Sequence, residues 1–268
     1  MRRRVFLTAC AVPLTGCTGI GTEVTTDTVV ERLVVEDGTR LRVVVENGDV
    51  SVSRAEGDEM VIEANRRTTE GEEGLDEIQL ITDESDGELT VTADYPETES
   101  FGERYAVDID VSVPAGVVLE RAESANGGVN VSDVSGEASP QLVSANGAVR
   151  AENIDGYVSL RSTNGSIEAT GVVGITRAST VNGSVDVEIR EVRRPAVIES
   201  SQGNVTVHVA ETVEAEFVLR TTNGSVDTGN VPLEDVNRDD GVRGVLNGGG
   251  STVEATTKNG NVSLRLLD

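Results

Sequence analysis

One cysteine near the start of the chain carries the clearest chemical signal in the sequence. Leu14-Thr15-Gly16-Cys17 has the form of a lipobox, a motif after which the cysteine is acylated on its sulfur and becomes the first residue of the mature chain. Cys17 is therefore the expected lipidation site. Cys10 lies before this motif and would be removed, so the mature chain would hold one cysteine and no intramolecular disulfide.

The residues before Cys17 have the pattern of an export signal. Arg3 and Arg4, followed by Val5-Phe6-Leu7, resemble the twin-arginine signal, which routes folded proteins out of the cell. An apolar stretch of about ten residues follows, too short for a bilayer span, which takes roughly 20 residues. Residues 1–16 are predicted to be a signal peptide. The mature protein is predicted to be held by lipid at the outer face of the cytoplasmic membrane, on the cell surface.

Residues that could support catalysis or bind a metal are few. The single histidine, His208, lies in the alternating run Val205-Thr206-Val207-His208-Val209, so its side chain is expected to point to solvent. A Ser–His–acid site would have to use this one outward histidine, and a structural zinc site needs cysteine thiolates or a second histidine. Asp235, Asp239 and Asp240 offer oxygen ligands for calcium, but no glycine-rich calcium repeat or EF-hand pattern is present. We expect no catalytic residue, no metal site and no cofactor.

A polysaccharide-acting enzyme on a β-helix scaffold is the alternative function. Hydrolysis of a glycosidic bond needs two carboxylates at a defined separation. The chain has 47 acidic residues, too many to single out such a pair. Two basic pairs follow the signal, Arg66-Arg67 and Arg193-Arg194, and both are interpreted as surface charge.

Sequons for N-glycosylation are frequent in the chain. Those of the form Asn-x-Ser/Thr are at Asn130, Asn164, Asn182, Asn204, Asn223 and Asn261. Asn164, Asn182 and Asn223 belong to Asn-Gly turns and are expected to serve the fold. Asn130 and Asn204 are expected on the outward face of strands, and they are the candidate glycosylation sites.

The charge of the chain limits its partners and suggests its environment. Acidic residues outnumber basic ones by 47 to 22, which gives a formal net charge of −25. Lys258 is the single lysine, and the other basic residues are arginines. This composition resembles that of proteins from extreme halophiles, in which molar salt shortens the Debye length to about 3 Å and screens the repulsion. Nucleic acid is excluded as a partner, because its phosphates need a basic patch.

A repeat dominates the remaining sequence. From Asn126 onward the dipeptide Asn-Gly recurs every 18 to 21 residues, with one gap filled by Gln-Gly and one wider step of 36 residues before the last copy, and Asn47-Gly48 is an earlier copy. The third and fifth residues after each Asn are mostly Val, Ile, Leu or Ala, the alternation of a strand with one buried face. The copies begin at Asn47, Asn126, Asn146, Asn164, Asn182, Gln202, Asn223 and Asn259.

The repeat predicts an all-β protein with one of two architectures. The favoured one is a parallel β-solenoid of coils of about 18–21 residues, in which stacked Asn side chains hydrogen-bond as a ladder and Asn adopts the left-handed conformation. Six coils from Asn126 onward would be followed by a last one after an inserted loop. The alternative is an antiparallel β-sandwich or barrel, because Asn-Gly is also the strongest signal for a type I′ hairpin turn.

The other segments are assigned from composition. Residues 17–30 are predicted to form a tether behind the lipidated cysteine, and residues 31–268 the repeat domain, with less regular strands before residue 122. No helix is predicted, and the acidic stretch Glu70 to Glu73 is interpreted as a solvated loop. Residues 233–250 are predicted to be a mobile insertion before the last coil.

These repeats resemble a prokaryotic β-strand-repeat family labelled "putative adhesin", a domain of unknown function. The resemblance covers residues 30–268. It rests on the Asn-Gly-x-Val-x-Val repeats, on Val113-Pro114-Ala115-Gly116 and on the closing Lys258-Asn259-Gly260-Asn261-Val262-Ser263-Leu264. It implies a solenoid-like fold, placement on the cell surface and no established catalytic residue. The expected function is adhesion, envelope organisation or sensing by a lipid-anchored, non-enzymatic protein, with an envelope glycan or a surface protein as candidate partner.

Overall fold

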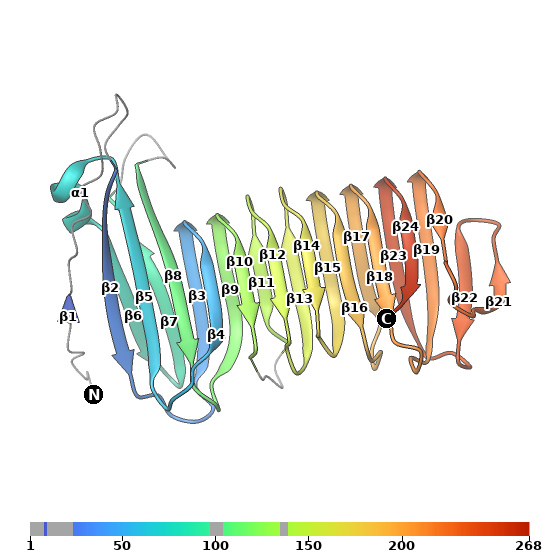
Figure 1. Ribbon diagram of the computed structural model, residues 1–268, viewed down its shortest axis with the longest axis horizontal. Coiled ribbons are helices and arrows are strands. Elements are labelled where there is room, and N and C mark those ends of the chain that lie inside the picture. Colours follow the sequence, from blue (N-terminus) through green and yellow to red (C-terminus); the bar gives the residue numbers. More distant parts are fainter. Residues whose placement is uncertain (1–7, 10–23, 97–103, 135–138, 268) are drawn as a thin grey trace.

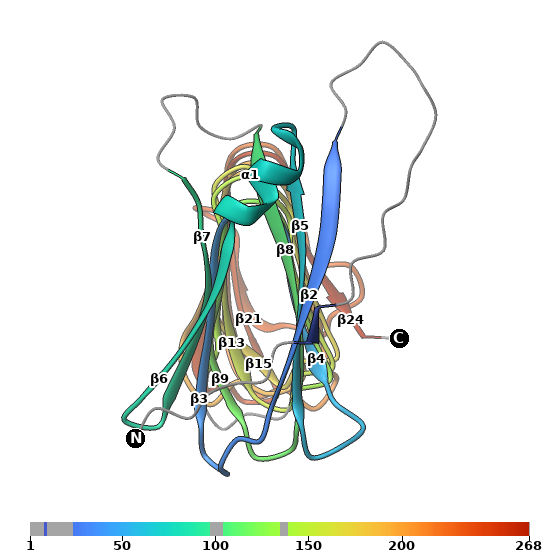
Figure 2. The ribbon, with the colours of Figure 1, turned by 90° about the vertical axis from the view of Figure 1, so that its left-hand side faces the viewer.

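The all-β class is confirmed. The computed structural model describes the backbone of residues 8–9 and the whole of residues 24–96, 104–134 and 139–267, which form two large mixed sheets and one short helix. The two sheets face each other along an elongated body, with the core between them (Figures 1 and 2). Within these residues the sheets do not close into a barrel, and no helix is long and apolar enough to cross a membrane. Arg3, Arg4 and Cys17 lie outside the described residues.

Each sheet contains twelve strands. The first sheet holds, in spatial order, β1 (Thr8–Ala9), β2 (Thr25–Leu33), β5 (Met60–Thr68), β8 (Tyr105–Val113), β4 (Val50–Arg54), β10 (Val129–Ser132), β12 (Val149–Glu152), β14 (Ile167–Thr170), β16 (Val185–Ile189), β18 (Val205–Val209), β24 (Val262–Leu266) and β20 (Val226–Asp227). The second holds β21 (Glu234–Asn237), β22 (Val242–Leu246), β19 (Ala215–Asn223), β23 (Ser251–Asn259), β17 (Ala196–Gln202), β15 (Gly174–Asn182), β13 (Tyr157–Ser162), β11 (Gln141–Ser144), β9 (Val118–Asn126), β3 (Arg40–Asn47), β7 (Glu88–Asp94) and β6 (Gln79–Ser85).

The repeat has a simple structural meaning. Each Asn-Gly (or Gln-Gly) turn joins a strand of the second sheet to a strand of the first, and we call such a two-strand unit a rung. Neighbouring rungs pair in parallel in both sheets, as β9 and β10 do with β11 and β12. Antiparallel pairing is confined to the two ends, for example β2 with β5 and β19 with β22.

The core comes from the positions that the repeat predicted. The third and fifth residues after each Asn or Gln are at most 1% exposed in seven of the eight copies, from Val50 and Val52 to Val262 and Leu264. Their removal from water is the main stabilising term, at roughly 1.5–3 kcal/mol for each large side chain. The exception is Val226 and Thr228, which are only half-buried because β20 is the last strand of its sheet.

The order of the rungs corrects the predicted order. The last rung of the chain, β23/β24, does not follow β19/β20 but lies between it and β17/β18. Residues 233–250 were predicted to be a mobile insertion, and that prediction was wrong in part: they contain β22, which pairs antiparallel with β19, and β21, which pairs antiparallel with β22 at the end of the second sheet. Pairing with β19 satisfies the backbone groups that a free loop would leave to water.

A short helix, α1 (Gly71–Glu77), corrects the prediction of a loop at the acidic stretch. Glutamate favours helix formation, and Leu75 of the helix and Ile78 just after it are buried. Figure 2 shows α1 at one end of the body. Arg66 holds the helix in place: its guanidinium donates to the carbonyl oxygens of Leu75 and Ile78 at 3.1 and 2.7 Å, and it pairs with Asp27. Arg66 is therefore a structural residue and not only surface charge.

Tyr95 covers the outermost Asn-Gly turn. Its hydroxyl donates to the carbonyl oxygen of Asn47 at 3.0 Å. Burial raises the pKa of Tyr95 to about 12, and the nearby charges of Glu46 and Asp108 raise it further, against the opposing effect of the hydrogen bond that the phenolic oxygen accepts from the Asn47 backbone N–H at 3.4 Å. The neutral phenol is thus the form that the fold favours.

We expect the stability of the protein to fall between pH 10 and pH 12 because of Tyr95. An unfolded tyrosine releases its proton near pH 10, whereas the folded one keeps it to about pH 12, so stabilisation is complete below pH 10 and is lost as the pH rises through the folded pKa. The slope contributed is at most about 1.4 kcal/mol per pH unit. Urea unfolding of the wild type and of Tyr95→Phe at several pH values measures it. Equal slopes in the two proteins would contradict this assignment.

Candidate functional site

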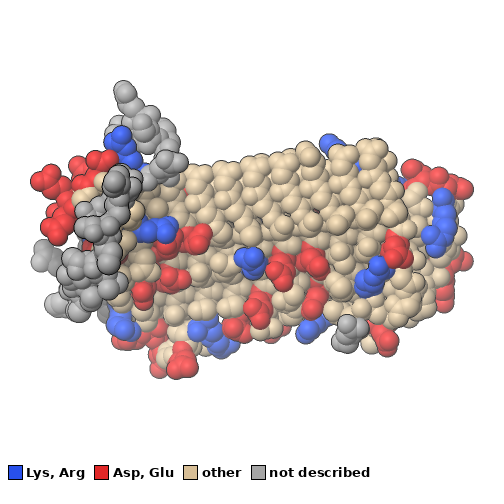
Figure 3. Space-filling model, turned by 45° about the horizontal axis from the view of Figure 1, so that its top comes forward, with Lys and Arg blue, Asp and Glu red and all other residues tan. Residues whose placement is uncertain are grey.

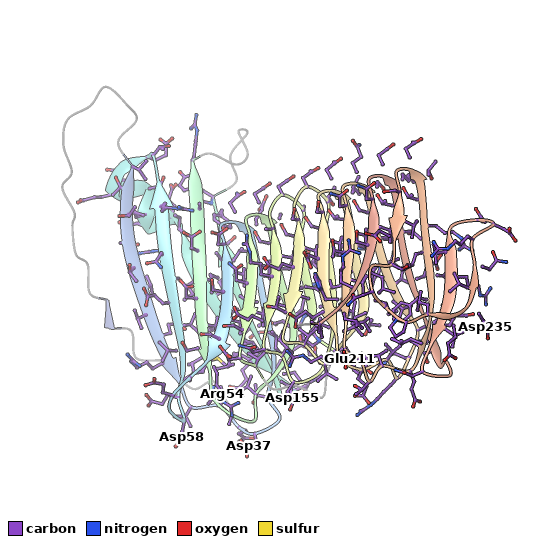
Figure 4. The ribbon with its side chains drawn as sticks, turned by 45° about the vertical axis from the view of Figure 1, so that its right-hand side comes forward. Asp37, Arg54, Asp58, Asp155, Glu211 and Asp235 are labelled. Carbon is purple, nitrogen blue, oxygen red and sulfur yellow. The ribbon has the colours of Figure 1, made fainter. Side chains whose placement is uncertain are left out.

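The Asn-Gly turns line one long edge of the molecule. We call this edge the turn ridge and define it as the four residues of each turn in seven rungs: 125–128, 145–148, 163–166, 181–184, 201–204, 258–261 and 222–225, in spatial order. Strand spacing of about 4.8 Å gives the ridge a length of about 29 Å. Figure 4 shows a regular row of side chains along this upper edge.

An amide ladder runs along the ridge, as the repeat predicted. The Nδ2 atom of each asparagine donates to the Oδ1 atom of the asparagine in the preceding rung, at 2.7–2.8 Å, from Asn47 through Asn126, Asn146 and Asn164 to Asn182. Asn223 donates to Asn259 in the same way at 2.8 Å. Gln202, one methylene longer, interrupts the series. One of the two N–H groups of each donor amide is used in the ladder, which leaves the other for a ligand or water.

The predicted reason for the Asn residues was wrong in one respect. None of the ladder asparagines has a positive φ; among the described residues other than glycine, positive φ occurs at Asp86, Asp133, Asn153, Asp235 and Asn247. Asparagine is needed in the ladder because its amide both donates and accepts, so that identical side chains can bond along a stack.

The glycine of each turn is required for close stacking. A Cβ atom on Gly147, Gly165 or Gly183 would lie 2.0–2.3 Å from the carbonyl oxygen of the glycine in the preceding rung. Backbone carbonyls of a paired sheet cannot move aside. The parallel rungs therefore depend on glycine for space at these positions, not for a hairpin conformation.

A row of hydroxyls beneath the ridge was missed from the sequence. Each of the seven rungs of the ridge has Ser or Thr two residues before its Asn or Gln, and this hydroxyl donates to a turn-glycine carbonyl of the neighbouring rung at 2.7–2.9 Å. The signal was present, because a polar residue recurs at a position that alternation predicts to be buried. The residues are Ser124, Ser144, Ser162, Thr180, Ser200, Thr221 and Thr257.

The ridge is almost free of charge. Of its 28 residues only Lys258 is charged, whereas charged residues make up 26% of the chain, which would give about seven in 28. Figure 3 shows this face as a broad band without acidic residues, bordered by charged side chains. The opposite edge differs: Asp37, Arg54, Asp58, Asp155 and Glu211 lie along it and are exposed (Figure 4).

The turn itself does not forbid charge. The first Asn-Gly copy, outside the ridge, reads Glu46-Asn47-Gly48-Asp49, and both acidic side chains are exposed there. Asp49 even accepts a backbone hydrogen bond from Gly128 at 2.7 Å. The absence of acidic residues from the other seven turns is therefore a property of the ridge and not a consequence of turn geometry.

The residues predicted as candidate sites are dispersed. His208 is on the outward face of β18, as predicted, with its Nε2 atom 3.2 Å from Asp186. Asn130 is half-buried on the outward face of β10. Asn204 is exposed but lies in a turn, not on a strand, and its Oδ1 accepts from the Asn261 backbone at 2.9 Å. Glycosylation of either asparagine stays a prediction.

The remaining groups do not assemble into a reactive centre within the described residues. Asp235 is in β21 while Asp239 and Asp240 follow it, and no described His, Cys, Asp or Glu side chains form a cluster of three that could hold a metal. Arg194 lies over the ring of Tyr157, 5.0 Å from its centroid, and Arg193 pairs with Glu191.

One surface depression on the second sheet contains a single carboxylate. It is lined by Arg42, Glu120, Arg121, Ser139 and Gln141. Arg121 is already bonded to Gln141 and to Glu123. Glycosidic hydrolysis uses two carboxylates across the bond, so this depression does not have that arrangement.

Comparisons with known proteins place the chain in a family but name no ligand. The model of the family described as Toastrack DUF4097 matches residues 39–265. No curated protein matches the chain.

Solved structures with a similar course of the chain come from bacteria. A putative cell adhesion protein from Clostridium sporogenes is 12% identical, with a TM-score of 0.39, and the match covers 90% of this chain and 100% of that one. A putative adhesin from Bacteroides fragilis is 11% identical, with a TM-score of 0.43 and coverage of 90% and 97%. A putative lipid binding protein from Parabacteroides distasonis is 15% identical, with a TM-score of 0.39 and coverage of 90% and 97%.

Proposed function

Because the chain belongs to the Toastrack DUF4097 family, whose model matches residues 39–265, we propose that it is a non-enzymatic cell-surface protein built on a parallel β-solenoid. We further propose that Cys17 anchors it by lipid to the outer face of the membrane after export through the twin-arginine signal at Arg3 and Arg4. The parallel pairing of successive rungs supports the solenoid, and the order of signal, lipobox and tether in the sequence supports the anchor.

The proposed role is binding of an extended envelope component along the turn ridge. The observation that carries it is the absence of acidic residues from the ridge on a chain of net charge −25. An acidic partner is repelled by the other faces of this molecule, and a neutral one would have to displace their hydrated carboxylates, so the ridge is where either can approach. The ridge is about 29 Å long and one turn wide, which suits an extended chain such as an envelope glycan.

The chemistry of the ridge fits a hydroxyl-rich partner. Its side chains are mainly Asn, Ser, Thr and Gln, with second amide N–H groups and hydroxyls that can exchange hydrogen bonds with sugar hydroxyls. Val181 adds an apolar contact, since it is 44% exposed at the tip of its turn. Each repeat offers a weak contact, and seven in register supply affinity through multivalency.

Acidic substitutions on the ridge test this role. Val181→Glu with Ser201→Glu would place on two adjacent rungs the residue that Glu46 provides in the first copy. We expect binding to purified envelope glycan in molar salt to fall about tenfold or more, because the new carboxylates would lie in direct contact with the partner, where salt screens least, and would have to lose their hydration. Sedimentation with the glycan, or surface plasmon resonance, measures it.

The matched control is Thr206→Glu with Ser263→Glu, which adds the same two charges on the outward faces of adjacent strands, β18 and β24, away from the ridge. It should bind like the wild type, and all variants should unfold at similar urea concentrations. Equal loss in the ridge and control variants would point to net charge and contradict the assigned surface. Absence of binding by the wild type to both envelope glycan and surface-layer protein would contradict the proposed role.

A further inference from the structure

The last rung of the chain fills a slot between two rungs that precede it. β23 pairs with β17 on one side and β19 on the other, so Val253 lies in register with both Ala196 and Phe217. β24 lies in the same way between β18 and β20. Residues 251–266 therefore complete both sheets from within, and β17/β18 and β19/β20 have to stand apart to admit them.

Both walls of the slot recognise the rung through the repeated turn chemistry. The Thr257 hydroxyl donates to the carbonyl of Gly203 at 2.9 Å, and the Thr221 hydroxyl donates to that of Gly260 at 2.8 Å. The Asn261 backbone donates to Asn204 at 2.9 Å. The segment that fits best is residues 251–266 of this sequence, and nothing in these contacts distinguishes the chain's own rung from that of a second copy.

A glycine-rich segment joins this rung to the rest of the molecule. Asn247, Gly248 and Gly249 have consecutive positive φ values of 51°, 80° and 84°. They carry the chain across the end of β19, because β22 pairs with one side of β19 and β23 with the other. The Nδ2 atom of Asn247 donates to the carbonyl oxygens of Glu211 and Val213 at 2.7 and 2.9 Å, whereas a Cβ atom on Gly248 would meet nothing within 4 Å. We call residues 247–250 the hinge.

We propose that two copies of the protein exchange their last rungs, so that residues 251–266 of each fill the slot of the other. The exchanged dimer makes every contact of the monomer, and the balance between them depends on the hinge and on protein concentration. The hinge lies at the edge opposite the turn ridge, so exchange leaves both ridges uncovered (Figure 1). Anchoring to one membrane would raise the effective concentration of the copies.

A disulfide trap tests the exchange in the full-length chain with Cys10 and Cys17 replaced by serine. Thr206 and Ser263 are register partners on adjacent strands, and both face outward. Parallel partners lie within the distance that a disulfide accepts. A chain carrying both Thr206→Cys and Ser263→Cys should form this disulfide, within one chain in the monomer and between two chains in the exchanged dimer, which establishes the inserted rung. Absence of both bonds would overturn the proposal.

The exchange itself is measured by mixing the two single variants. Thr206→Cys and Ser263→Cys proteins, distinguished by mass, are partially unfolded together at high concentration, returned to molar salt and oxidised. We expect a covalent heterodimer well above the level of the two homodimers. The proposal would be overturned if the double variant forms the disulfide but the mixture contains no more heterodimer than homodimer.

The hinge provides a second, independent measurement. Gly248→Val should raise the ratio of dimer to monomer about tenfold in size-exclusion chromatography with light scattering, because an L-residue disfavours the left-handed bend and favours the extended hinge of the dimer. Gly38→Val is the matched control: its φ of 83° and its open surroundings are the same, but it lies in a turn before β3. An equal dimer fraction in the two variants would contradict the role of the hinge.

Discussion

Gly165→Ala is expected to destabilise the protein by about 3 kcal/mol or more, a large effect for one methyl group. The added Cβ atom would lie 2.0 Å from the carbonyl oxygen of Gly147 and 2.4 Å from its carbon. Both atoms belong to the backbone of the next rung. Relief of the contact requires the rungs to separate, which weakens the amide bond from Asn164 to Asn146 and the hydroxyl bond from Ser162 to Gly147. Urea unfolding in molar KCl measures the loss.

Gly57→Ala is the matched control for this prediction. A Cβ atom at Gly57 would meet nothing within 4 Å, and its φ is not positive. The same chemical change should therefore alter stability by less than about 1 kcal/mol, and reduced entropy of the unfolded chain can make it slightly favourable. If Gly165→Ala and Gly57→Ala unfold at the same urea concentration, the result would contradict the close approach of the Gly165 and Gly147 turns.

Cys17→Ser is expected to move the protein from the membrane fraction to the medium almost completely. The predicted anchor depends on the sulfur of this one residue, and a serine hydroxyl does not replace it. Membrane affinity from an acyl chain grows by about 0.8 kcal/mol for each buried methylene, so its loss removes most of the binding. Fractionation of the native host, with intact-mass analysis of the purified protein, measures both location and lipid mass.

Cys10→Ser controls for the effect of a cysteine substitution near the start of the chain. Cys10 lies in the segment predicted to be removed, so this variant should stay membrane-bound and carry the mass of the lipid. A wild type that is released without added lipid mass would contradict the anchor. Because the mature domain is unchanged in both variants, the result is independent of glycan binding by the turn ridge.

The sequence by itself determined the class of the fold and its repeating unit. Alternation after each Asn-Gly identified the buried positions, because a strand with one wet face shows a period of two that no turn or loop imitates over eight copies. The amide ladder could also be predicted, since identical side chains at a constant interval stack when the rungs do. The predicted outward position of His208 follows from the same alternation and is confirmed.

Local patterns could not determine the order of the rungs. All rungs have nearly the same sequence pattern, so β17 could pair with either β19 or β23 under the same local rules. The packing of the whole domain decides between these arrangements and places β23 between β17 and β19. Helix α1 is hidden for a related reason: seven residues are too few to show a period, and burial of Leu75 and Ile78 decides their conformation.

The turn ridge depends on both the sequence of each turn and the tertiary structure that brings the turns together. Its residues are plain in the sequence, but their lack of charge becomes meaningful only when seven separate turns are seen to form one edge. Charge and exposure are properties of a surface, and a surface is assembled by tertiary structure from residues that are up to about 140 positions apart. Sequence therefore determined the chemistry of each turn, and the stacking of rungs decided that these turns form a continuous site.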